Sequence, residues 1–597
     1  MNTLTARRKL YFLFAFFAIL LISITSAIFG NLKSFAQSNE RTKNKSAETS
    51  SLRWLTVDEK EFQHIQNVLQ KKGVSFDLKI VERRAGLLVV AADEQQSVEL
   101  TQNMHEEFQK CGGFISHETP EAARLSLEEG LHADSNLRAV EYTINNPTLV
   151  NSLHAEAKEP EIRETITRLS TDFPNRRYNL PSGTDSANWI KNKWTQIAAG
   201  RSDISVEFFN HSPNTSPQPS IILTVRGTTL PDEVVVFGAH QDSIHRSGES
   251  FAAPGADDDA SGIASMTEVI RVLVARNFHP QRTVKFMAYA AEEIGLRGSY
   301  DIATNFQARG VNVVGVLQLD MTNYKASSTS DIAIITDYTN AAQNQFLRDL
   351  LATYQPTLAV VNSACNYGCS DHASWYQKGY PASFPFEAPF PANPYIHTTN
   401  DTIAQSGGNA DHALKFTKLA LSYLGELAKE TIGISGTVAY GITPANQTQK
   451  FVLGVLASVN SASPATTDSA GFYLIKNLMP NGSYSVTLSK TGNENGITAF
   501  DAVLALRHVA ANGEGTINLT PNQQTAADTD KSGTITAFDA TQILRYVAAN
   551  GQSNLTGAAG QWNFTPPSRS YSAFSGFDAD ENYTAVLVGD VDGSWTP

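Results

Sequence analysis

The chain has 597 residues, of which 41% are hydrophobic and 18% charged, and its formal net charge at pH 7 is −13. This composition is ordinary for globular proteins, and the length suffices for roughly three or four domains. The negative charge argues against nucleic acid and acidic lipid surfaces as partners.

Residues 1–36 have the composition of an export signal. Basic residues at 7–9 precede an uncharged run over 10–30, and the tripeptide Ser-Phe-Ala follows at 34–36. That order is typical of a secretory signal peptide. The apolar run is also long enough to span a bilayer, so an uncleaved membrane anchor is the alternative. We favour export, which predicts an extracellular or periplasmic protein.

Residues 37–140 combine a polar linker with a small folded unit. Residues 37–50 are polar and mixed in charge, which favours disorder. Beyond them the hydrophobic pattern predicts a small α/β unit, which is either an accessory domain or a propeptide. Asn145-Asn146-Pro147 marks a boundary after it. The expected elements are helices over 59–72 and 98–109 and a strand over 86–92.

From about residue 159 to residue 427, apolar runs of strand length alternate with longer amphipathic segments. This alternation predicts an α/β domain with a mixed, mostly parallel sheet flanked by helices on both faces. The expected helices are 162–169, 187–199, 262–275, 341–353 and 415–429. The expected strands are 220–227, 233–238, 284–290, 311–319 and 331–336.

Acidic and histidine residues directly follow three of these strands. His240 and Asp242 follow the second strand, Glu292 and Glu293 the third, and Asp320 the fourth. In an open α/β sheet, ligands bind beyond the carboxyl ends of the strands, so we expect these side chains to converge. Adjacent residues at a strand end point in different directions, so one glutamate can bind a metal while its neighbour acts as a base.

Residues Asp257, Asp258 and Asp259 place three like charges in one glycine-flanked turn. Such crowding is unfavourable unless a cation compensates it. A calcium loop is the rival interpretation, but Ala-Ser-Gly follows where further oxygen ligands would be needed.

One more histidine, His397, completes a set of histidine and carboxylate ligands without thiolate. This set favours zinc, with cobalt or manganese as substitutes. A carboxylate that bridges two ions, with one histidine and one carboxylate on each ion, is the arrangement of a two-metal hydrolase.

The three cysteines are Cys111, Cys365 and Cys369. In an exported protein the closely spaced Cys365 and Cys369 are expected to form a disulfide that stiffens their loop. Zinc binding by this pair is the weaker interpretation, because a structural site needs four ligands. Cys111 is left without an assigned role.

After Gly433 the pattern changes to short alternating strands separated by Asn, Gly, Ser and Pro. It predicts an all-β sandwich module over 434–489. Within 490–597, the segment 496–513 recurs as 534–551. Each copy is an amphipathic helix that follows a loop and ends at Asn-Gly, which predicts a pair of loop-helix repeats.

The motifs GAHQDS, PGADDDASG, MAYAAEEIGLRGS, LQLDMTNY, CSDHASW and YIHTTNDT occur in this order between residues 238 and 402. On these motifs the segment 147–432 resembles the secreted bacterial leucyl aminopeptidases, a family of two-zinc exopeptidases. The sequence LTQNMHEEFQKCGGF at 100–114 resembles the pro-region that this family removes. The resemblance implies a zinc-exopeptidase fold, a monomeric peptidase domain, and hydrolysis of N-terminal, preferably large apolar, residues from peptides or proteins.

The resemblance also implies a ligand set. His240 and Asp320 would hold one zinc ion, Glu293 and His397 the other, and Asp258 would bridge the two. It further implies a cis peptide bond after the bridging aspartate.

A base and a substrate pocket are implied in the same way. Glu292 would be the general base, and Asp242 the carboxylate behind His240. The chain is one residue shorter than the family pattern between Phe386 and His397, which leaves the fine substrate preference open. The pocket residues, ringed by the Cys365–Cys369 loop, would be Met321, Ile335, Tyr367, Phe384, Phe386, Phe390 and Ile396.

Two other functions fit the same scaffold. One is a catalytically inactive binding protein, attached to sugars or to a partner by its C-terminal modules. The other is a related two-zinc enzyme such as a carboxypeptidase. The complete ligand set with Glu292 disfavours the first, and the motif match and the apolar pocket disfavour the second.

The second repeat begins with an EF-hand-like loop that fits calcium. It resembles the loop-helix repeats of dockerins, which implies a cell-surface or protein partner for the C-terminal modules. The implied calcium ligands are Asp528, Asp530, Ser532, Thr534 and Asp539. In the first repeat Lys490 and Gly492 stand where acidic ligands are needed, so we expect calcium only in the second.

Overall fold

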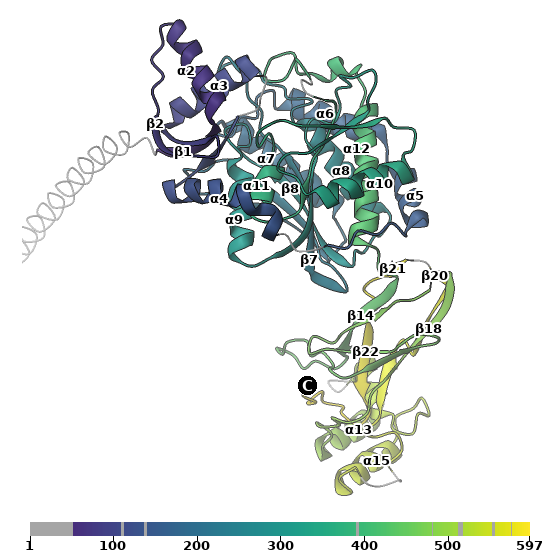
Figure 1. Ribbon diagram of the computed structural model, residues 1–597. Helices are drawn as coiled ribbons and strands as arrows, with labels where there is room; N and C mark the ends of the chain where they lie inside the picture. The colour runs from purple at the N-terminus through teal and green to yellow at the C-terminus, as the bar shows by residue number, and fades with distance from the viewer. Residues whose placement is uncertain are drawn as a thin grey trace, which may run out of the picture.

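The computed structural model describes residues 52–108, 113–136, 140–389, 393–479, 481–511, 518–551, 556–574 and 576–597. The predicted signal peptide and linker lie outside these ranges, as do Cys111 and Phe390. Three separate hydrophobic cores define an N-terminal unit (52–136), a central unit (147–428) and a C-terminal unit (433–597) (Figure 1). Across the described ranges, no helix combines the length and apolarity needed to cross a membrane.

The N-terminal unit is a four-stranded sheet with helices on both faces, which confirms the predicted small α/β unit. Successive side chains of a strand point to opposite faces, so Leu88 and Val90 pack with α2 and α3 while Val89 packs with α4. The strands in sheet order are β2 (Lys79–Arg84), β3 (Leu87–Ala92), β1 (Arg53–Asp58) and β4 (Phe114–His117). The helices are α2 (Glu59–Lys71), α3 (Glu94–Phe108) and α4 (Pro120–Asn136).

The central unit is built on a six-stranded mixed sheet, as predicted. In sheet order its strands are β12 (Ala382–Ser383), β9 (Asn312–Gln318), β7 (Leu230–His240), β8 (Arg282–Tyr289), β6 (Ser220–Val225) and β5 (Ile204–Phe209). The first four are parallel to their neighbours, and β6 and β5 complete the sheet with antiparallel pairings. A second sheet consists of β11 (Val360–Ser363), β10 (Ile332–Ile335) and β13 (Pro385–Phe386).

Helices cover both faces of this sheet because its central strands are apolar on both sides. Along β7, Val235 and Phe237 face one core, and Val234 and Val236 face the other. The first core contains side chains from α5 (Pro147–Glu156), α6 (Glu159–Asp172), α7 (Pro181–Ile197), α8 (Ala260–Ala275), α10 (Ala341–Tyr354), α12 (Asp411–Tyr423) and η2 (Leu424–Ala428). The second contains side chains from α9 (Arg297–Ala308) and α11 (His372–Gln377).

Helix α9 is one element that the sequence pattern did not reveal. It follows Leu296, which lies in the left-handed region (φ 57°) and makes no side-chain cap, and its second residue is Gly298. A helix without a capping residue at its start lacks the usual local signal. The sequence pattern did not reveal β5 and β11 either.

The C-terminal unit contains two sheets and three helices. One sheet has β17 (Phe472–Lys476), β14 (Gly433–Tyr440), β22 (Tyr583–Leu587) and β19 (Trp562–Thr565), with β21 (Phe577–Asp578) also paired to β14. The other has β16 (Ala465–Thr466), β15 (Leu456–Val459), β18 (Gly482–Ser489) and β20 (Ser568–Phe574). The helices are α13 (Ala499–Ala510), α14 (Pro521–Ala527) and α15 (Ala537–Ala548).

The strands pair across residue 490, where the sequence predicted a boundary between two modules. Strand β22 pairs with β14, and β20 pairs with β18. The chain therefore leaves the two sheets after β18, forms the helical repeats, and returns to complete both sheets. Residues 434–489 and 490–597 consequently share one hydrophobic core.

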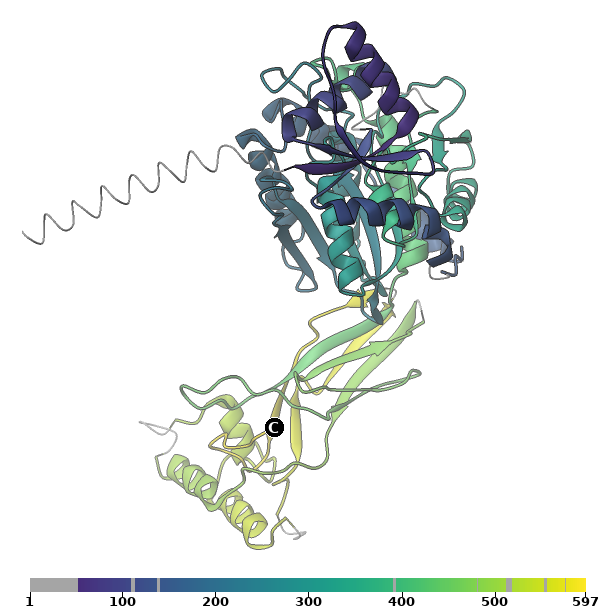
Figure 2. The same ribbon diagram turned by 60° about the vertical axis from the view of Figure 1, so that its left-hand side comes forward.

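The N-terminal and C-terminal units attach to different ends of the central unit (Figures 1 and 2). The C-terminal unit contacts the segment just before β8, where Asn277 Nδ2 donates to the carbonyl of Phe577 (2.7 Å) and the His279 and Phe577 rings lie 4.2 Å apart. The N-terminal unit instead contacts the loop that follows β8, where Ser116 N donates to Gly295 O (2.9 Å).

Candidate active site

The carboxyl ends of β7, β8 and β9 meet at one edge of the sheet. Neighbouring strands are in register there, with His240 opposite Tyr289 and Gly238 opposite Gln318. The residues that follow the strands, Glu292, Glu293 and Asp320, are therefore delivered beside His240.

The turn before α8 brings Asp258 to the same edge. Its bond to Asp259 is cis. Helix α8 begins directly against the end of β9, since a Cβ on Gly262 would lie 2.1 Å from the carbonyl oxygen of Leu319. Only glycine permits that approach. Gly262 therefore fixes how closely the turn that carries Asp258 packs against the end of β9.

The two carboxylate oxygens of Asp258 face the two histidines. Oδ1 lies 3.0 Å from His240 Nε2, and Oδ2 lies 3.0 Å from His397 Nε2. Asp320 Oδ1 lies 3.5 Å from His240 Nε2, and Glu293 Oε2 lies 2.7 Å from His397 Nε2. The five predicted ligands thus form two groups that share the central carboxylate.

These five residues are at most 3% exposed. Several of their polar atoms lack a hydrogen-bond partner among the described residues, including His240 Nε2, both Glu293 oxygens, Asp320 Oδ1 and His397 Nε2. Buried polar atoms without partners are costly, and a bound cation would satisfy them. The residues therefore fit a metal centre.

The electrostatics of the site agree with a centre built for cations. Burial alone would lower the pKa of both histidines, but Asp320 beside His240 and Glu293 beside His397 raise these pKa values well above the ordinary value. Burial, with Asp258 nearby, raises the pKa of Glu293 to about 7. Positive charge between these carboxylates would relieve their repulsion.

Asp259 also lies within ligand reach of His240 and Asp320. Its carboxylate, however, accepts hydrogen bonds from the backbone N–H groups of His240 (3.1 Å), Gly262 (2.8 Å) and Met321 (3.3 Å). It is therefore occupied in capping α8 and in joining three segments of the site. Asp258, in contrast, faces both histidines.

Asp242 contacts His240 differently from the sequence-based expectation. His240 Nδ1 lies 3.1 Å from the main-chain oxygen of Asp242, and the carboxylate is more distant at 3.7 Å. The carboxylate instead accepts from Glu292 N (3.0 Å) and Glu293 N (3.4 Å). Asp242 thus positions both the histidine and the paired glutamates.

The predicted base Glu292 is 2% exposed, and its Oε2 has no hydrogen-bond partner among the described residues. Burial raises its pKa well above the ordinary value, and the nearby carboxylates of Asp371, Glu293 and Asp320 raise it further, against the opposite effect of His240. A carboxylate in this position is available to accept a proton from a group bound in the site.

Two residues that support the ligands were not assigned from the sequence. The carboxylate of Asp401 accepts from the backbone N–H groups of Asp257 and Asp258, each at 3.1 Å. Ser370 Oγ donates to Asp320 Oδ2 (2.7 Å). Both lie in the motifs that carry the resemblance, but nothing in their local spacing indicated these contacts.

Six of the seven predicted pocket residues form one buried apolar cluster with the two cysteines of the adjoining loop. Phe390 lies outside the described residues. The disulfide between Cys365 and Cys369 is present, as expected. The cluster consists of Met321, Ile335, Cys365, Tyr367, Cys369, Phe384, Phe386 and Ile396.

The predicted calcium loop also gathers its carboxylates, with ligand atoms of Asp528, Asp530 and Asp539 within 4.8 Å of one another. Ser532 Oγ donates to the carbonyl of Thr534 (3.1 Å). In the first repeat, ligand atoms of Asp501 lie within 4.8 Å of those of Asp590 and Asp592 from the end of the chain.

Comparison with known proteins places these features in context. Residues 220–422 match Peptidase family M28. A probable leucine aminopeptidase of Arthroderma benhamiae is 33% identical over 344 residues, covering 56% of this chain and 87% of that protein. Leucine aminopeptidase 1 of Arthroderma otae is 35% identical over 302 residues, covering 48% of this chain and 79% of its own length.

A solved structure gives a similar result. The LapA aminopeptidase of Legionella pneumophila matches 64% of this chain and 99% of its own, with 29% identity and a TM-score of 0.53. The range that matches the family, 220–422, contains all five predicted metal ligands and Glu292.

Proposed function

We infer the chemistry of this chain from its family: it belongs to peptidase family M28. It is a zinc metallo-aminopeptidase with a two-zinc site, and it removes N-terminal residues from peptides with a preference for leucine and similar large apolar side chains. The observation that carries this conclusion is the shared carboxylate of Asp258, whose two oxygens face His240 and His397 at 3.0 Å each.

We propose that His240 and Asp320 hold one zinc ion, that Glu293 and His397 hold the other, and that Asp258 bridges them. The two ions would supply Lewis acidity and lower the pKa of a water molecule. Glu292 is placed to accept a proton from the attacking water and to pass it to the leaving amine. Asp242 holds the backbone of Glu292 and Glu293 in place for this transfer.

The apolar cluster beside the site is the proposed pocket for the N-terminal side chain. Its residues are 7% exposed or less, so a leucine side chain that enters it is removed from water. Burying such a side chain is worth about 1.5–3 kcal/mol. This gain supports the preference for large apolar residues.

Replacing Glu292 with glutamine tests the assignment of the base. The amide cannot take up the proton, so we expect kcat on a leucyl chromogenic substrate to fall by ~10²–10⁴ while metal analysis still finds two zinc ions. Glu207→Gln, at an exposed position of β5, is the matched control and should leave kcat unchanged. Near-normal turnover by the Glu292 variant would contradict the assignment.

We propose that residues 37–140 are a propeptide and that residues 1–36 direct export. The N-terminal unit docks beside the catalytic loop through Ser116 and Gly295 and through an ion pair between Glu94 and Arg297 (2.8 Å). The disulfide between Cys365 and Cys369 is compatible with an exported protein.

Mass spectrometry of the mature secreted protein tests the propeptide. We expect a new N-terminus between residues 135 and 152, because the chain there passes from α4 to α5 and contains the Asn145-Asn146-Pro147 boundary, in which Asn145 and Pro147 are exposed. A fully active mature protein that retains residues 52–129 would contradict the proposal.

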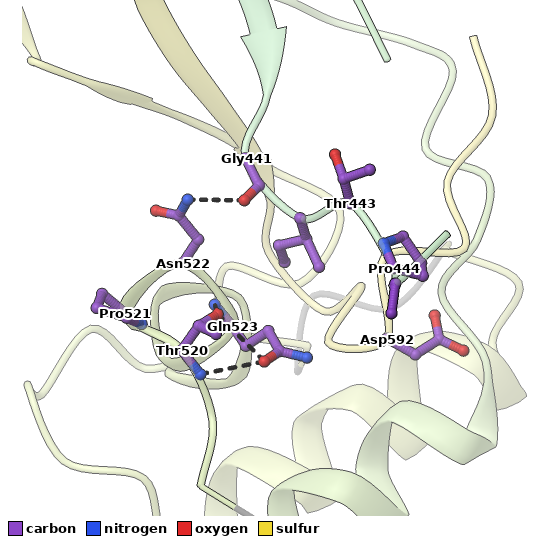
Figure 3. Close-up of a pocket in the computed structure, with 10 residues that line it drawn as sticks. Gly441, Thr443, Pro444, Thr520, Pro521, Asn522, Gln523 and Asp592 are labelled. Atoms are coloured by element: carbon purple, nitrogen blue, oxygen red, sulfur yellow. Dashed lines mark hydrogen bonds between the residues drawn. The ribbon is translucent and has the colours of Figure 1, made fainter. Parts of the chain in front are cut away.

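We further propose that the C-terminal unit serves for attachment, that its loop-helix repeats within 490–597 are dockerin-like, and that the second repeat binds calcium. Asp539 Oδ1 accepts from Thr529 N (2.9 Å) and Asp530 N (3.1 Å), which shapes the loop around its carboxylates. The helices are tied to the sheets by Asn522, which donates to Gly441 O (2.7 Å) at the edge of a hollow of about 490 Å³ (Figure 3). A cell-surface or protein partner would bind this unit.

A further inference from the structure

One histidine of the N-terminal unit reaches the metal centre. His105 lies in the last turn of α3 and is 6% exposed. Its ring lies against the ring of His397, with 4.3 Å between the centroids and 40° between the planes. The N-terminal unit therefore covers this side of the site with an imidazole.

The His105 ring has an unused nitrogen. Nδ1 is buried and has no hydrogen-bond partner among the described residues. Leaving a buried polar atom unpaired is costly, so its position calls for a partner beyond those that the described residues supply. Neutral imidazole is a common zinc ligand through either ring nitrogen.

The neighbour of His105 is itself a proposed ligand. His397 Nε2 lies 2.7 Å from Glu293 and 3.0 Å from Asp258. Catalytic zinc sites keep one position open for substrate or water. An imidazole beside His397 is therefore placed to compete for that position.

Both ends of α3 are held against the central unit. In the first turn, Glu94 pairs with Arg297 (2.8 Å) and accepts from the Tyr178 hydroxyl. His105 contacts His397 in the last turn. The two contacts are eleven residues apart, or about 16 Å along a helix, so they hold α3 against the central unit at two separate points.

We propose that His105 is a removable ligand of the metal centre, which binds the zinc ion of Glu293 and His397 in the uncleaved chain and blocks substrate entry. This inference rests on the proposed two-zinc site and on the proposed removal of residues 37–140. Cleavage would then open the coordination position and the pocket together.

X-ray absorption spectroscopy of the zinc-loaded full-length chain tests the proposal directly. The uncleaved wild type should show three imidazoles for two zinc ions, and uncleaved His105→Ala should show two. The cleaved wild type should also show two, because it has lost His105 without any substitution. His105→Gln provides a second variant that retains a polar side chain if the alanine variant folds poorly.

The matched control is His64→Ala. His64 lies on α2 of the same unit and pairs with Glu107 at the surface, with its side chain 51% exposed. This variant should keep three imidazoles. In the uncleaved form, His105→Ala should also hydrolyse a leucyl substrate at least roughly fivefold faster than wild type, the lower end of usual coupling between sites, whereas His64→Ala should not.

Equal imidazole numbers in uncleaved wild type and uncleaved His105→Ala would overturn the role of His105. The proposed function is judged separately, on the cleaved wild type. If that form binds no zinc or is inactive, the proposed function fails; if it is active with two zinc ions while the uncleaved proteins do not differ, only the role of His105 fails.

Discussion

At the scale of single residues, the site depends on groups that hold the ligands as much as on the ligands. Asp401 is 1% exposed, and its two carboxylate oxygens accept from consecutive backbone N–H groups of the turn that carries Asp258. The position of the shared carboxylate is therefore set by a side chain that does not face the metal itself.

Asp401→Asn should weaken the site without unfolding the protein. The amide keeps one acceptor and replaces the other with a donor that faces a backbone N–H, so the turn must shift. Loss of such an outer contact typically costs 10–100-fold in metal affinity or activity, and we expect a decrease of about that size in competition with a chelator. Asp411→Asn, at an exposed position at the start of α12, is the control. Unchanged zinc affinity in the Asp401 variant would contradict this role.

At the scale of elements, strand β4 joins the N-terminal unit to the central unit. Its last residue, His117, is 1% exposed, lies 3.1 Å from Thr56 Oγ1 and packs edge-on against the Tyr300 ring at 4.7 Å. Burial lowers the pKa of His117 well below its ordinary value, and the positive charges of Lys378 and Arg53 act in the same direction.

This lowered pKa predicts weaker docking of β4 in acid. The folded protein holds His117 neutral, whereas the free imidazole takes up a proton below about pH 6.5. The contribution of His117 is therefore complete above that pH and is lost as the pH falls below it. We expect the difference in thermal unfolding midpoint between wild type and His117→Asn to shrink from pH 7.5 to pH 5.

Gln63→Ala, at an exposed and non-titrating position of α2 in the same unit, is the control and should not change how the unfolding midpoint depends on pH. A difference between wild type and His117→Asn that is constant, or larger at pH 5, would show that His117 is not held neutral in the folded protein.

At the scale of the whole molecule, the two outer units meet opposite ends of the central sheet. The C-terminal unit contacts residues 277–279, before β8, and the base follows the other end of that strand. Eight residues of strand correspond to about 26 Å. The C-terminal unit therefore lies far from the chemistry, whereas the N-terminal unit lies against it.

Deleting all residues after Gly433 should leave hydrolysis of small aminoacyl substrates within a few-fold of the full-length enzyme. Every proposed ligand, the base and the pocket lie before Thr402, and the lost contacts are at the far end of β8. Steady-state kinetics of the mature truncated enzyme checks this expectation. Loss of activity in a folded, zinc-loaded protein would show that the C-terminal unit contributes to the site.

The sequence alone predicted the main sheet and the edge at which the candidate ligands gather, because these signals are local. His240, Glu293 and Asp320 each follow an apolar strand directly, and parallel strands in register bring their ends together. The pocket and the disulfide came from the resemblance, and six pocket residues do form one cluster. Helix α9 was missed because it lacks a capping residue.

Only the tertiary structure decided which distant segments meet. Asp501 accepts a hydrogen bond from Val591 N (2.7 Å), 90 residues further along the chain. The end of the chain therefore lies beside the first repeat. The local spacing, which placed Lys490 and Gly492 at the ligand positions, did not predict this contact. His105 meets His397 because α3 is docked at both ends. Periodicity and capping report which element a segment forms, but contacts between elements depend on which surfaces become buried together, and no local pattern records that choice.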